Sequence, residues 1–161
     1  MRWKDEPWII ADVETSGLDA SRDRVIEIGF CRVEGRRVVE RAGWLVDPEL
    51  PSLPPAIVQL TGLRIEDLRG QPRFPAVAPE VLARLGSAPV VVAYNAGFDR
   101  GFIGAELQRA GHALDGQPWP SHWIDPLVFV REMDRYERSK KLTDAAARRG
   151  ITVGGDAHRA A

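Results

Sequence analysis

The sequence predicts an α/β or α+β domain built on a mixed β-sheet. Two β-rich runs come early, at residues 24–33 and 37–46, and the Glu-Gly-Arg between them predicts a hairpin. From residue 75 onward, apolar strand-like runs alternate with segments of helical spacing. Antiparallel strands followed by strand–helix alternation indicate a sheet with both kinds of pairing. In such sheets the chemistry usually gathers at strand ends.

The individual elements follow from local signals along the chain. A first strand is predicted over residues 8–11, an apolar run that ends at Asp-Val-Glu, and Thr-Ser-Gly then marks a turn. Four prolines between residues 48 and 55 predict an irregular segment. The later predictions are one or two helical turns at 56–60, helices at 75–85, 98–110, 126–133 and 141–149, and strands at 89–94 and 122–125.

Length and composition limit the class of protein. A chain of 161 residues suits a single domain spanning 1–161. The net charge of -1 neither supports nor excludes nucleic-acid binding. A single cysteine, Cys31, excludes an internal disulfide and suits a reducing cytoplasm. Because no apolar run approaches the length of a membrane span, we expect a cytoplasmic protein without a membrane partner.

Asp12 and Glu14 are the first candidate site residues. They lie at i and i+2 at the end of an apolar strand, so both side chains can point to the same face. Two carboxylates on one face repel each other unless a cation lies between them, and Mg²⁺ or Mn²⁺ prefers such oxygen ligands. A polar strand end before a turn is the plainer alternative.

Asp99 and His158 are the other candidates. Asp99 comes just after the valine-rich run and is expected to join the acidic pair from a neighbouring strand, although an aspartate also suits the start of a helix. Phe98 offers a stacking face for a base, or packs in the core. A histidine such as His158 can deprotonate a water near neutral pH. His112 and His122 are interpreted as structural.

These residues resemble the motifs of the DEDD exonuclease superfamily, in its histidine branch (DEDDh). Residues 12–18, Asp-Val-Glu-Thr-Ser-Gly-Leu, are similar to its first motif, and 95–99, Asn-Ala-Gly-Phe-Asp, to its second. Residues 158–161, His-Arg-Ala-Ala, resemble the opening of its third. Shorter likenesses occur at 60–63 and 141–145. The resemblance implies an RNase H-like fold: a five-stranded mixed sheet with one antiparallel strand, flanked by helices.

The resemblance also implies a two-metal 3′→5′ exonuclease that releases nucleoside 5′-monophosphates. Two Mg²⁺ or Mn²⁺ ions would clamp the attacking and leaving oxygens. Asp12 would bridge both ions, Glu14 would bind one, and Asp99 the other. His158 would take the proton from the attacking water. The implied partner is a nucleic-acid 3′ end, single-stranded DNA before RNA, with a DNA polymerase as a candidate protein partner.

The implied substrate contacts come from the first two motifs. Thr15, Gly17 and Leu18 would line the terminal nucleotide, with Leu18 as an apolar wedge or, alternatively, as ordinary packing. Asn95 and Phe98 would complete the contacts.

One departure from the family pattern leaves an alternative open. The third motif ends in an aspartate that would fall just past Ala161, so we expect the end of the domain to lie beyond the given sequence. If that aspartate is absent, a non-catalytic nucleic-acid-binding domain of the same fold becomes the better interpretation. A dinucleotide-dependent oxidoreductase and an ATPase are disfavoured, because their glycine-rich loops are missing.

Overall fold

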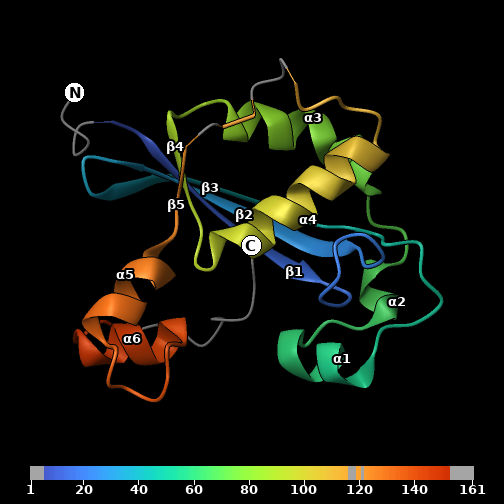
Figure 1. The fold of residues 1–161 in the computed structure, drawn as a ribbon. Helices are drawn as coiled ribbons and strands as arrows, with labels where there is room; N and C mark the ends of the chain where they lie inside the picture. The colour runs from blue at the N-terminus through green and yellow to red at the C-terminus, as the bar shows by residue number, and fades with distance from the viewer. Residues whose placement is uncertain (1–5, 116–118, 121, 153–161) are drawn as a thin grey trace.

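Five strands form one mixed sheet in the order β3-β2-β1-β4-β5 (Figure 1). The computed structural model describes residues 6–115, 119–120 and 122–152. The strands are β1 (Trp8–Thr15), β2 (Val25–Glu34), β3 (Arg37–Leu45), β4 (Val90–Val92) and β5 (Trp123–Ile124). Strand β2 pairs antiparallel with β1 and β3, while β4 pairs parallel with β1 and β5. The predicted sheet with one antiparallel strand is therefore confirmed.

The predicted hairpin joins β2 to β3. Glu34 pairs with Arg37, and the two residues between them, Gly35 and Arg36, have φ angles of 51° and 74°. Two consecutive positive φ values match the twist of the strands in a two-residue hairpin turn. Glycine adopts this conformation easily, whereas Arg36 takes it under some strain.

Six helices lie within the described ranges: α1 (Pro55–Thr61), α2 (Ile65–Leu68), α3 (Phe74–Leu85), α4 (Ala96–Arg109), α5 (Pro126–Met133) and α6 (Leu142–Arg148). Five of them confirm predicted helices, with ends that differ from the prediction by at most two residues. The prediction missed α2, because four residues are too few to show a helical period. Helix α4 begins two residues earlier than predicted, directly after Asn95, whose left-handed φ of 70° ends the preceding strand segment.

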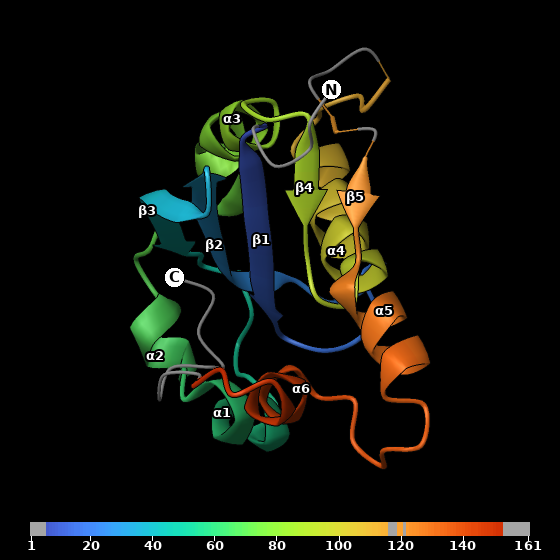
Figure 2. The same cartoon turned by 90° about the vertical axis from the view of Figure 1, so that its left-hand side faces the viewer.

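The main hydrophobic core lies between the sheet and helices α3 and α4 (Figure 1). Its largest fully buried side chains from the helices are Phe74, Leu85, Phe102, Ile103 and Leu107. Helices α1, α5 and α6 lie near the end of the sheet where β1 finishes, and β4 and β5 run toward that same end (Figure 2). No helix in the described part of the chain is long and apolar enough to cross a membrane.

The first strand carries the acidic pair at its end, as predicted, and is longer than the predicted apolar run of residues 8–11. β1 stays paired with β2 through Thr15, opposite Val25. Backbone pairing to a neighbouring strand outweighs the weak strand preference of Asp and Glu. Asp12 and Glu14 are therefore held on a strand in the middle of the sheet.

Candidate active site

The alternation of β1 places Asp12 and Glu14 on one face of the sheet, as predicted. Ile9, Ala11 and Val13 are buried in the core, while Asp12 is exposed and Glu14 is half-buried. Successive side chains of a strand point to opposite faces, so both carboxylates lie on the side away from this core.

Asp99 reaches the acidic pair from the first turn of α4. Its side chain is 3% exposed, and its Oδ1 accepts a hydrogen bond of 3.0 Å from the backbone N–H of Val13. Burial raises the pKa of Asp99 to about 8, with a further rise from the charge of Asp12 and a smaller one from Glu14. The structure thus brings together the first three predicted site residues.

Glu27 is a fourth carboxylate beside this group, and the sequence analysis missed it. It is fully buried in β2 and directly opposite Glu14 in the antiparallel register. Residues directly opposite each other on adjacent strands project to the same face. An isolated acidic residue inside an otherwise apolar strand was the available signal, because a charged side chain is rarely buried without a specific role.

The donor set of this site suits a hard divalent cation. Carboxylate oxygens are the ligands that Mg²⁺ and Mn²⁺ prefer, and Asp99 lies close enough to Asp12 and Glu14 for their charges to add to the effect of burial in raising its pKa. Across residues 6–115, 119–120 and 122–152, no three His, Cys, Asp or Glu side chains already form a metal-binding cluster. His158, the predicted general base, lies outside the described residues.

The end of β1 and the loop that follows it carry the predicted substrate contacts Thr15, Gly17 and Leu18. Thr15 is buried, and its hydroxyl donates to the carbonyl of Gly17 at 2.6 Å, so it holds the loop. A Cβ at Gly17 would overlap the carboxylate of Asp23, so a larger residue at this position would displace that side chain. Leu18 is 84% exposed, a position open to contact with a ligand.

A buried ion pair holds this loop against α4. Glu106 is 1% exposed, and its carboxylate accepts bonds from Arg24 Nε at 2.7 Å, Arg24 Nη2 at 3.1 Å and the Val25 N–H at 3.1 Å. Arg109 of the same helix donates to the carbonyls of Ala20 and Asp23. This ion pair could not be predicted from local sequence, because Arg24 and Glu106 are 82 residues apart.

Replacing Glu106 with alanine is expected to lower the free energy of unfolding by about 3 kcal/mol. Removing one partner of a buried pair leaves the other without compensation, and the Val25 N–H also loses its acceptor. Urea denaturation measures the change. Gln108→Ala, an exposed site on the same helix, is the matched control and should change stability by less than about 0.5 kcal/mol. Equal effects of the two variants would contradict the structural role of Glu106.

Asp125, which was not predicted as a site residue, hydrogen-bonds to the start of the second motif, residues 95–99. Oδ1 of Asp125 accepts from Leu127 N at the start of α5 and from Asn95 N, both at 2.9 Å. The exposed Asn95 is thereby fixed in its left-handed conformation at the start of α4. An Asp before Pro and an apolar helix was the available signal, since it is a typical N-cap.

Phe98, the remaining predicted contact, packs against the main core. Its ring centroid lies 4.8 Å from that of Phe102. The core interpretation of this side chain is therefore confirmed, and only part of its ring is left exposed. Its contact with a base stays a prediction.

A mixed sheet of this order, with acidic side chains gathered on its central strand, is the architecture of the RNase H-like nucleases. The zinc-bound form of the E. coli exonuclease I–ssDNA complex has the same fold, with a TM-score of 0.80 and 21% sequence identity, over 96% of this chain and 37% of that one. The sequence pattern of the RNase_T exonuclease family matches residues 9–161. The chain belongs to this family, the DEDD 3′→5′ exonucleases.

Two relatives show where such sequences occur. A DNA polymerase III PolC-type protein of Clostridium perfringens is 34% identical over 149 residues, which is 92% of this chain and 10% of that protein. The 3′-5′ exonuclease DinG of Bacillus subtilis is 36% identical over 108 residues, 66% of this chain and 11% of that protein. The chain therefore spans only a small part of the length of either relative.

Proposed function

We propose that this chain is a single exonuclease domain that removes nucleotides stepwise from the 3′ end of a single strand, with DNA preferred to RNA. The observation that carries the proposal is the meeting of Asp12, Glu14 and the buried Asp99, whose pKa is raised by burial and by the two other carboxylates. The exonuclease I complex contains single-stranded DNA, which supports that substrate class. The PolC-type relative supports a polymerase as a candidate partner.

Asp12, Glu14 and Asp99 are the residues we assign as ligands of divalent cations, in keeping with a family that generally uses such ions. Bound cations would supply Lewis-acid stabilisation of charge on the phosphate oxygens. The chain's own groups orient the substrate: the exposed Leu18 would contact the terminal base, and the backbone amides of the Thr15–Gly17 turn would lie near the 3′ hydroxyl. His158 would accept the proton of the attacking water.

The test is a gel assay with 5′-labelled DNA and RNA oligonucleotides in Mg²⁺, in Mn²⁺ and in chelator. Stepwise shortening of the DNA that stops in chelator is the expected result. The 5′ label distinguishes direction, because removal from the 5′ end would release the label in the first step. Equal or faster shortening of RNA would overturn the preference for DNA.

A non-catalytic nucleic-acid-binding domain is the second candidate. The observation that favours it is that the described residues hold no preformed metal-binding cluster. This candidate predicts that the labelled oligonucleotide is bound but not shortened, in every metal condition. The same assay, combined with a gel-shift lane, therefore separates the two functions.

A further inference from the structure

A tight turn directly after α5 presents an aromatic ring to solvent. The N–H of Glu137 donates to the carbonyl of Asp134 at 2.8 Å, which closes the turn with Arg135 and Tyr136 at its centre. Tyr136 is 88% exposed, and the guanidinium carbon of Arg135 lies 5.0 Å from the centroid of its ring. A large exposed aromatic side chain stacked with an arginine is a typical platform for an unpaired base.

The segment around this turn is basic, although the whole chain carries a net charge of -1. Residues 131–149 contain seven basic and four acidic side chains, so the local balance is positive. Arg138 and Lys141 are exposed and have no acidic side-chain partner among the residues the structure describes. Unpaired surface cations beside an exposed aromatic ring favour a polyanion as the binding partner.

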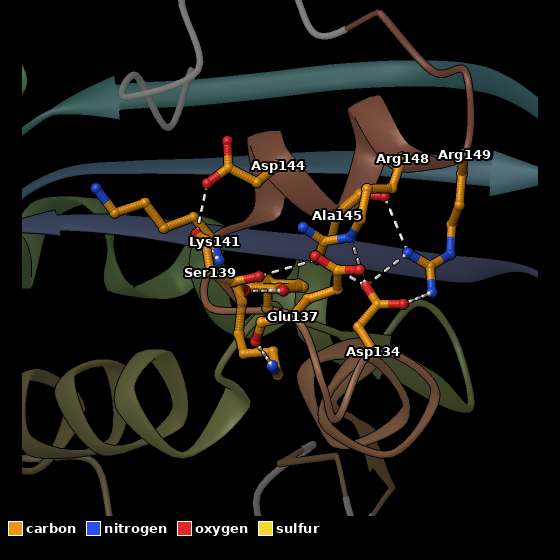
Figure 3. A network of polar contacts seen from close by, with 10 residues as sticks. Asp134, Glu137, Ser139, Lys141, Asp144, Ala145, Arg148 and Arg149 are labelled. Atoms are coloured by element: carbon orange, nitrogen blue, oxygen red, sulfur yellow. Dashed lines mark hydrogen bonds and ion pairs between the residues drawn. The ribbon is translucent and has the colours of Figure 1, made fainter.

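The turn is held in place by a network of ion pairs with α6 (Figure 3). Asp134 contacts Arg148 Nη2 at 2.6 Å and Arg149 Nη1 at 3.0 Å, and Arg148 also donates to the carbonyl of Ser139 at 3.0 Å. These bonds, led by that from Arg149, lower the pKa of Asp134 to about 2, so the carboxylate stays charged at neutral pH. These contacts stabilise the turn from which the exposed ring of Tyr136 projects.

The same segment is attached to the candidate active site. The hydroxyl of Tyr94 donates to the carbonyl of Lys140. Tyr94 follows β4 and directly precedes Asn95, which begins the motif that carries Asp99. The turn therefore lies toward the end of the sheet at which β4 and β5 finish, where α5 and α6 lie (Figure 2).

We propose that this turn is a second contact surface for single-stranded nucleic acid, on which Tyr136 stacks with a base while Arg138 and Lys141 contact phosphates. This proposal rests on the proposed 3′→5′ activity, because the nucleotides bound at the turn would be those upstream of the 3′ end that lies in the active site. A protein partner is disfavoured because this segment exposes Lys141, and lysine is depleted in protein–protein interfaces.

The test compares a trinucleotide with a twelve-residue DNA strand in steady-state assays of the full chain. Tyr136→Ala is expected to raise KM for the longer strand by about 5- to 150-fold, the effect of losing one base–aromatic stack, with kcat unchanged. The trinucleotide leaves only two nucleotides upstream of its 3′ residue, so we expect it not to contact the turn and to show no change. Tyr136→Phe is the matched control and should keep the KM of the original protein, because it retains the stacking face.

The affinity for the labelled twelve-residue strand, measured by fluorescence anisotropy in chelator, tests this contact surface separately from the proposed hydrolytic activity. Even a chain that hydrolyses nothing should bind this strand more weakly after Tyr136→Ala. The double variant Arg138→Gln/Lys141→Gln should make the slope of log K against log salt shallower by about 1.4, which is about 0.7 for each lost phosphate contact on a single strand. Unchanged affinity in Tyr136→Ala overturns the proposal, as does an equal loss for both strand lengths.

Discussion

Asp12→Ala is expected to lower metal-dependent hydrolysis of 3′ ends by more than about 100-fold. Changes to groups that merely orient metal ligands already cost 10- to 100-fold, so loss of a ligand should cost at least about the larger value. Asp12 is exposed, and alanine at this position leaves no cavity in the core. Single-turnover rates on 5′-labelled DNA in Mg²⁺ measure the loss, and thermal unfolding should show an intact fold.

Glu66→Ala is the control for Asp12→Ala, because Glu66 is an exposed acidic residue on α2. It should retain full activity. Asp12→Asn keeps the size of the side chain and removes its charge, so it should be nearly as inactive as the alanine variant. Activity of Asp12→Ala within twofold of the original chain would show that Asp12 is no metal ligand.

Much of the fold follows from hydrophobic pattern and turn chemistry in the sequence. The hairpin at Gly35 and the end of α1 at Gly62 were predictable, because a positive φ at each position suits glycine. The shared face of Asp12 and Glu14 follows from the period of a strand. These are local properties, which a stretch of a few residues encodes by itself.

Features that depend on distant partners were not predictable. The exact end of β1, at Thr15, depends on pairing with β2. Glu106 has the sequence context of an ordinary surface residue of α4, and only its contact with Arg24 explains its burial. The left-handed Asn95 similarly relies on Asp125, which lies 30 residues further along the chain. Tertiary contacts override local preference in each case.

The buried position of Asp99 should make the metal-free protein less stable as pH rises. Its pKa is about 8 in the folded chain against 3.8 for an ordinary aspartate. Between these values the unfolded chain releases the proton that the folded chain still holds. Because the folded state binds more protons, the free energy of unfolding falls through this window and levels off above it.

Asp99→Asn should remove this dependence, because the amide oxygen can still accept the bond from Val13 N while no charge is buried. In chelator, the free energy of unfolding of the variant should equal that of the original chain near pH 4. Near pH 9 it should be higher by about 2–4 kcal/mol. The upper limit is about 6 kcal/mol, because each unit of pKa shift corresponds to about 1.36 kcal/mol. Urea denaturation at a series of pH values measures the difference, with the exposed Asp115→Asn as control.

Mg²⁺ should stabilise the original chain near pH 9 more than it stabilises Asp99→Asn, because the cation offsets the repulsion that the variant lacks. A difference that stays constant with pH would mean that Asp99 ionises normally, and the charge argument for a cation at this site would then fail.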